Sequence, residues 1–200
     1  MFLLFVGLCC CMQAQDIRTL FVEAPDSVFP LQPKRMRVEL AEFAAAGMRY
    51  NLSNALDGKS VIEYVTDDYM LLRSSGMSTM QLRKLPFGDS FVICVVNTVV
   101  AEAADSRIAF FDSKWRRLSA GEFFVFPQIK EFFVSSEAGA GAEAGLCDIY
   151  LVELLLGKEN NSLVATYTMP DYMSDEEAEK VRPLLRAIVF RWNGNRFVSE

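Results

Sequence analysis

Residues 80–100 read MQLRKLPFGDSFVICVVNTVV, and this stretch decides the fold. From Met80 to Leu85 apolar and polar side chains alternate, which is typical of a strand with one buried face. Pro86 to Asp89 predicts a turn. Phe91 to Val100 is almost entirely apolar, as expected of a strand that is buried on both faces. The stretch therefore predicts an antiparallel pair at the centre of a sheet.

Further strands are predicted on both sides of this pair, because short apolar runs alternate with turn residues. The Asn-Gly pair at 193–194 is a strong hairpin signal. The predicted strands cover residues 61–65, 69–73, 107–111, 115–118, 149–156, 163–169, 187–192 and 196–198.

Helices are fewer. Apolar residues at 36, 40, 43 and 44 recur with helical spacing, so a helix is predicted over 33–46, with Gly47 ending it. Ser174 before three acidic residues predicts a short helix that stops near Pro183. Residues 127–133 fit a short helix better than strand pieces. Residues 16–34 carry several prolines and are expected to be an irregular segment docked on the core. The predicted class is α+β, mainly antiparallel sheet with a few helices on one face.

Residues 15–200 are expected to form a single α+β domain. A strand–turn–strand pattern with a returning arginine occurs at 108–118 and again at 188–197. This repetition raises the alternative of two halves, 15–118 and 119–200. The Ala/Gly/Glu stretch from Ser135 to Gly145 is the best candidate for a loop between them.

The beginning of the chain resembles an export signal. No charged residue occurs from Phe2 to Met12, an apolar length that suits a signal peptide and is too short to span a bilayer. Ala14 is a suitable small residue before a cleavage site, which would make Gln15 the new N-terminus. Residues 1–14 are therefore predicted to be a signal peptide, and the protein to be periplasmic or secreted. Lipid attachment at one of Cys9, Cys10 and Cys11 is the alternative.

The composition of the chain bears on the classes of partner it can bind and on the chemistry of its cysteines. The net charge is −6, which argues against a nucleic-acid partner, and no later stretch is predicted to span a membrane. After signal removal two cysteines remain, Cys94 and Cys147, and an oxidising compartment permits a disulfide between them. Two buried thiols are the other interpretation.

The chain contains no histidine, which excludes His-dependent nucleophilic catalysis and zinc sites with histidine ligands. No nucleotide, phosphate or nucleophile-elbow motif occurs, so no catalytic residue, cofactor or metal is assigned. Asp67-Asp68 fits a turn better than a cation site. A glycosidase would need two converging carboxylates, for which candidates lie near predicted sheet elements: Glu63, Glu131, Asp148 and Glu153.

Phenylalanine is abundant, with 16 residues in the chain. Most must lie in the core, but a dense group between 123 and 133 is the place where an exposed apolar patch could mark an interface. Its members are Phe123, Phe124, Phe126, Phe132 and Phe133.

Several stretches resemble one family. They are residues 20–31 (LFVEAPDSVFPL), 69–72 (YMLL), 92–96 (VICVV) and 190–197 (FRWNGNRF). Together they resemble a family of uncharacterised exported proteins of gut Gram-negative anaerobes, in the domain-of-unknown-function class. That resemblance implies a compartment and no activity. It also implies a candidate O-glycosylation site at Ser27 within Asp26-Ser27-Val28, for which a turn with Asp26 capping its own backbone is the simpler interpretation.

The predicted halves are also similar, at the level of architecture, to the beta-lactamase-inhibitor-protein-like fold, but function does not follow from a fold. Two functions are carried forward from the sequence. The first is a non-enzymatic binding or accessory protein that meets another protein or an envelope component. The second is a carboxylate-based hydrolase acting on glycans.

Overall fold

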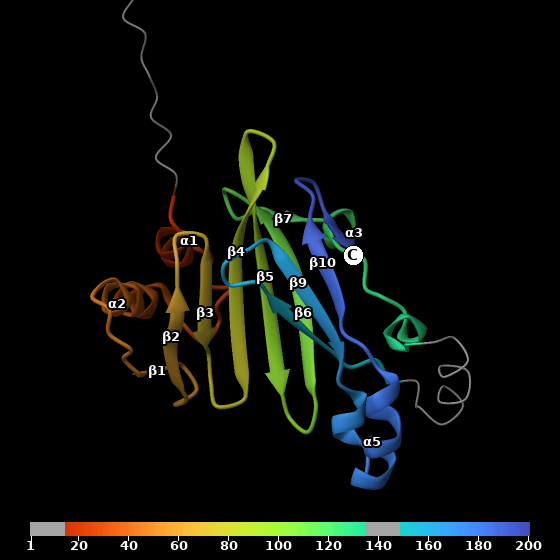
Figure 1. Cartoon of the computed structure of the whole chain (residues 1–200). Helices are drawn as coiled ribbons and strands as arrows, with labels where there is room; N and C mark the ends of the chain where they lie inside the picture. Colours follow the sequence, from red (N-terminus) through yellow and green to blue (C-terminus); the bar gives the residue numbers. More distant parts are fainter. Residues whose placement is uncertain (1–14, 135–148) are drawn as a thin grey trace, which may run out of the picture.

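The computed structural model describes residues 15–134 and 149–200, and it confirms the α+β class: two antiparallel sheets with short helices around them (Figure 1). Seven strands form the first sheet as a simple meander in which each strand pairs with the next along the chain. They are β1 (Leu52–Ser53), β2 (Lys59–Val65), β3 (Tyr69–Arg73), β4 (Ser78–Phe87), β5 (Ser90–Val100), β6 (Ala104–Asp112) and β7 (Arg117–Leu118).

The long hairpin of β4 and β5 is the centre of this sheet, as its sequence predicts. Its turn is shorter than expected and consists of Gly88 and Asp89, with Gly88 at a φ of 55°. Pro86 belongs to the strand and pairs with Phe91. A proline fits there because β3 ends its pairing with β4 at Arg83, so the proline nitrogen faces no neighbouring strand.

The second sheet has four strands in the order β11-β10-β9-β8. These are β8 (Val152–Leu156), β9 (Ser162–Tyr167), β10 (Ile188–Trp192) and β11 (Phe197–Ser199). The predicted Asn-Gly hairpin joins β10 to β11, and Gly194 adopts a φ of 97°. Short helices connect or flank these strands: α3 (Ala120–Phe123), η1 (Ile129–Phe132), η2 (Met169–Tyr172), α5 (Asp175–Val181) and η3 (Arg182–Leu184). The helix expected at 127–133 is thus a single 3₁₀ turn.

Two helices precede the first sheet and lie beside β2 and β3 (Figure 1). The second, α2 (Lys34–Ala45), is the predicted one, and Gly47 follows it at a φ of 70°. The first, α1 (Ile17–Glu23), corrects the expectation of an irregular entry segment. Asp16 caps its N-terminus, and its buried residues Ile17, Leu20 and Phe21 share one helical face, while the first proline comes only at Pro25.

Each face of the first sheet is buried against a different layer. Alternate residues of β5 show this: Ile93 and Val95 pack with the residues of α1 and α2, whereas Cys94 and Val96 pack with those of the second sheet. This confirms burial on both faces for the middle of β5, from Val92 to Val96. The expected division at 118/119 falls between β7 and α3, and the division into halves stays a prediction.

The polar face of β4 is not exposed, contrary to the alternation in its sequence. Gln81 and Arg83 are 2% and 7% exposed because the edge strand β8 lies against the first and the turn after β8 lies against the second. The Leu156 N–H donates to Gln81 Oε1 (2.9 Å), and Gln81 Nε2 donates to the Leu154 carbonyl (3.0 Å). The Leu154 N–H donates to Ser106 Oγ of β6 (2.9 Å). Side chains of the first sheet therefore replace the missing strand neighbour of β8.

Candidate functional site

Most of the phenylalanine group from 123 to 133 lies in the core. Its buried members are at most 4% exposed: Phe123, Phe124, Phe132 and Phe133. The chain after β7 fills the space between the two sheets, where the Phe123 ring stacks on Phe110 with centroids 5.0 Å apart. An exposed patch of five phenylalanines is therefore not present, and only Phe126, 39% exposed, remains at the surface.

The Cys94 thiol is fully buried between β4 and β6 and faces the second sheet. Burial raises the pKa of this thiol far above its ordinary value, because the thiolate would lose its hydration. Cys147 lies outside the described residues, so the disulfide between the two stays a prediction.

Cys94 is expected to resist a thiol reagent in the folded protein and to react once the chain is unfolded. A Cys147→Ser variant, expressed without residues 1–14, isolates this thiol. Its labelling should be negligible in buffer and reach one thiol per chain in denaturant, measured by mass spectrometry. Rapid labelling of the folded variant would contradict the burial. Two reactive thiols in the unreduced, denatured chain that lacks residues 1–14 and keeps Cys147 would exclude the disulfide.

Ser27 lies in an exposed turn that follows α1. Asp26 does not cap its own backbone in this turn: its carboxylate accepts from Arg37 Nη1 at 2.8 Å. The Val28 N–H instead donates to the Pro25 carbonyl at 3.0 Å. O-glycosylation of Ser27 stays a prediction, and the turn leaves its side chain accessible.

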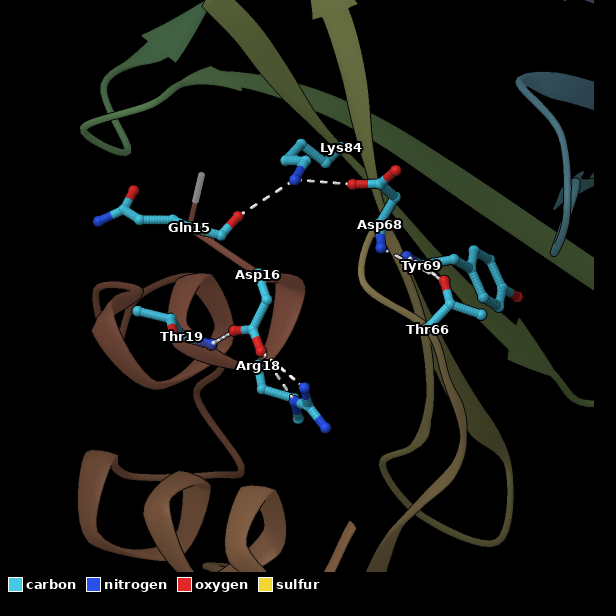
Figure 2. A network of polar contacts seen from close by, with 8 residues as sticks. All are labelled: Gln15, Asp16, Arg18, Thr19, Thr66, Asp68, Tyr69 and Lys84. Carbon is cyan, nitrogen blue, oxygen red and sulfur yellow. Dashed lines mark hydrogen bonds and ion pairs between the residues drawn. The ribbon is translucent and has the colours of Figure 1, made fainter. Parts of the chain in front are cut away.

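A polar network fixes the beginning of the described chain (Figure 2). Ala14 lies outside the described residues, and Gln15 is the first of them. Lys84 of β4 donates to the Gln15 carbonyl (3.2 Å) and pairs with Asp68 (2.7 Å). Asp68 thus lies in a turn, as expected of Asp67-Asp68, with its carboxylate against an ammonium group.

Asp16 belongs to the same network (Figure 2). Burial alone would raise the pKa of its carboxyl, but the Thr19 N–H at 2.8 Å and the Arg18 guanidinium at 2.8 Å outweigh burial and lower that pKa. The network therefore anchors α1 to the sheet, which is a structural role.

The candidate glycosidase carboxylates lie on different elements. Glu63 of β2 pairs with Arg73 at 2.7 Å, and Glu131 accepts from the Gln128 N–H at the start of η1. Burial raises the pKa of Glu153 on β8, and the neighbouring charge of Asp171 raises it further. Asp148 lies outside the described residues. Within residues 15–134 and 149–200, no group of three or more acidic or cysteine side chains could hold a metal ion.

Glu153→Gln is expected to stabilise the fold at neutral pH. A carboxyl whose pKa is raised on folding favours the folded state when protonated, and this advantage is lost as the pH rises through the folded pKa. The uncharged amide should therefore raise the melting temperature by a few degrees at pH 7 and lose that advantage below about pH 4. Thermal unfolding at both pH values measures the difference. An equal gain at both would show that charge is not the cause.

The β1–β2, β3–β4 and β5–β6 connections lie at one end of the first sheet, because consecutive strands are antiparallel (Figure 1). Exposed apolar side chains gather at this end. Met77 and Val100 are 56% and 44% exposed, and the Val100 N–H donates to the Met77 carbonyl. Val99 is 48% exposed, and Tyr172 of η2 is 53% exposed. We call Met77, Val99, Val100 and Tyr172 the loop-end surface.

A cavity of about 710 Å³ opens at this surface, within the size range of ligand pockets. Val99 and Tyr172 line it together with Leu151, which is apolar, and with Asp105 and Arg107 of β6. Asn97 and Glu102 also line it, so its wall combines apolar side chains with polar and charged ones, a mixture that is usual where proteins bind partners. The sequence did not mark these residues, because they come from separate turns and strand ends and follow no common periodicity.

Within the part of the chain that the structure describes, no helix is long and apolar enough to cross a bilayer. No curated protein matches the chain. A solved structure described as a domain of an uncharacterized protein from Porphyromonas gingivalis W83 is similar to it, with 29% identity and a TM-score of 0.77. That match covers 90% of this chain and 96% of the other. A family model described as protein of unknown function (DUF3256) matches residues 9–197. The chain therefore belongs to the DUF3256 family, which confirms the domain-of-unknown-function class that its sequence resembles.

Proposed function

We propose that this chain is a non-enzymatic binding or accessory protein of the cell envelope, and that it contacts its partner through the loop-end surface. The observation that carries the proposal is the clustering of exposed Met77, Val99, Val100 and Tyr172 at one end of the first sheet, where Val99 and Tyr172 also line the cavity. Large exposed apolar groups that gather in one place usually mark an interaction site. Loops held by a rigid sheet are a common location for one.

The compartment is part of the same proposal, and the uncharged apolar run from Phe2 to Met12 supports it. Cleavage after Ala14 would leave Gln15 and the Asp16 cap of α1 in place, so the fold would keep its first contacts. N-terminal sequencing of the protein from its host tests this. A chain that still carries residues 1–14, or a lipid on one of the three cysteines at 9–11, would contradict a soluble periplasmic or secreted form.

A pull-down from envelope extract tests the binding surface. Two baits are compared, the wild-type protein and the double variant Met77→Gln/Val100→Thr. The double variant removes exposed apolar area without changing the net charge. The partner should be captured by the wild type and lost, or reduced at least about tenfold, with the double variant, because apolar contacts at the centre of an interface dominate its binding energy.

Leu155→Thr is the matched control, since Leu155 is 45% exposed on β8 of the four-stranded sheet and does not line the cavity. It should capture the partner as well as the wild type does. Equal loss with both variants would place the interaction elsewhere, and full capture by the double variant would exclude the loop-end surface.

A carboxylate-based hydrolase acting on glycans is the second candidate. The observation in its favour is that burial, and then the neighbouring charge of Asp171, raise the pKa of Glu153, as a general acid requires. Turnover of a host or dietary polysaccharide that is lost in Glu153→Gln would support it. Turnover that survives this change would exclude Glu153 as the acid.

A further inference from the structure

The strand β11 is the outermost strand of the four-stranded sheet, and its pairing with β10 decides which main-chain groups it offers. The Asn193 N–H donates to the Arg196 carbonyl (3.1 Å), and the Glu200 N–H donates to the Val189 carbonyl (3.0 Å). Arg196, Val198 and Glu200 therefore direct their main-chain groups toward β10, because such groups alternate in direction along an antiparallel strand.

The main-chain groups of Phe197 and Ser199 point the other way, to the outer edge. In residues 15–134 and 149–200 no strand pairs with this edge. A row of unpaired N–H and C=O groups is a template for another strand. The edge is short, so a strand that docks here needs further complementarity to bind.

Space is available beside this edge. A groove of about 380 Å³ has Phe197 and Val198 of β11 on one side and Val125 and Phe126 on the other. Val125, Phe126 and Val198 are 59%, 39% and 40% exposed. Glu131, Arg196 and Ser199 also line the groove, so its walls carry both apolar and polar groups. Phe124 keeps its ring against Phe197, with centroids 6.3 Å apart, so the groove lies close to the edge strand.

The sequence of the strand is complementary to itself. Arg196, Val198 and Glu200 are alternate residues and share the outer face of the sheet, and all three are exposed. If a second β11 pairs antiparallel about a two-fold axis at Val198, Arg196 lies opposite Glu200 of the other copy and Val198 lies opposite its equivalent. Phe197 and Ser199 then exchange main-chain hydrogen bonds across the axis.

The ion pairs within one copy do not prevent this pairing between two copies. Glu200 already accepts a hydrogen bond from Arg191 of β10, which holds its carboxylate on the outer face. Arg196 forms no ion pair with any side chain in the described part of the chain. An opposite charge directly across two strands is stabilising, and a like charge is destabilising.

We propose that β11 is a self-association edge, at which two copies of this chain join their four-stranded sheets into one eight-stranded sheet. The self-complementary order of Arg196, Val198 and Glu200 favours a second copy over an unrelated strand. The contact is isologous and uses the same edge of both copies, so it closes at two chains.

Sedimentation velocity over a concentration series tests the proposal on the purified protein. The wild type should show a reversible monomer–dimer equilibrium. Arg196→Glu should weaken association at least about tenfold, because two attractive pairs become two repulsive ones. The same holds for Glu200→Arg. The double variant Arg196→Glu/Glu200→Arg should restore association to near the wild-type level, which a merely structural role of either residue would not produce.

Two further variants complete the experiment. Arg35→Glu changes the net charge by the same amount at an exposed position of α2, and it should dimerise as the wild type does. Ser199→Pro removes an outward N–H that bonds to no other described residue, and it should dissociate the dimer while leaving the circular dichroism spectrum unchanged. A wild type that stays monomeric at every concentration would overturn the proposal. A dimer that tolerates both Arg196→Glu and Ser199→Pro would do so as well.

Discussion

Gln81→Leu is expected to destabilise the protein by about 3 kcal/mol, although Gln81 looks like an ordinary surface residue in the sequence. Its amide serves two main-chain groups of the edge strand β8, the Leu156 N–H and the Leu154 carbonyl. Leucine has a similar size and offers neither contact. Both groups would stay buried without a partner, and each costs about 1–3 kcal/mol. Urea unfolding followed by fluorescence measures the loss.

Gln15→Leu is the control for this change. Among the described residues its side chain bonds to Glu23 at the surface, so the free energy of unfolding should change by less than about 0.5 kcal/mol. Similar small effects for both glutamines would mean that β8 obtains its edge hydrogen bonds elsewhere. The Ser106→Ala variant removes the remaining contact to the Leu154 N–H and should add to the effect of Gln81→Leu.

Arg37→Met is expected to cost about 2–4 kcal/mol of stability. Arg37 is 1% exposed in α2, and its guanidinium donates to the carbonyl groups of Gln32 (2.6 Å) and Ala24 as well as to Asp26. These contacts hold the proline-rich segment 24–32 against the helix. Methionine fills part of the volume but leaves the carbonyl groups unpaired, whereas Asp26, 67% exposed at its side chain, would turn to water.

The same helix provides the control, because Arg35→Met removes a guanidinium that is 93% exposed and pairs with Glu39 one turn away. Such surface pairs contribute little, so this variant should lose less than about 0.5 kcal/mol. Thermal and urea unfolding of both variants give the comparison. Equal stability of the two would contradict the role of Arg37 in fixing residues 24–32.

The sequence predicted the strands and hairpins well, because their period of two and their turn residues are local signals. The 193–194 hairpin and the strand around Cys94 are where expected. The predicted solvent exposure was wrong where tertiary contacts bury a polar side chain. Gln81 and Arg83 alternate with apolar neighbours as solvent-facing residues do. Yet Gln81 bonds to strand β8, and Arg83 bonds to the turn after it, in both cases to a residue 75 positions later.

The candidate surfaces were harder to predict. The phenylalanines from 123 to 133 predicted an exposed patch because they are closely spaced in the sequence. Closely spaced aromatic residues are equally typical of a core between two sheets. The loop-end surface joins residues from three parts of the chain, and only the antiparallel order of the strands brings Met77 and Val100 together. The edge at Arg196–Glu200 depends on which strand is outermost, and strand order is not visible in a local pattern.

The dependence of β8 on Gln81 and Ser106 has a consequence for the order in which the chain folds. The seven-stranded sheet is complete at Leu118, and its pairs are all between sequence neighbours, so it can form as soon as this part has been synthesised. The four-stranded sheet is synthesised later, when the Gln81 and Ser106 side chains that bond to its edge strand β8 are already in place. We therefore expect the N-terminal sheet to act as the template of the C-terminal one, and not the reverse.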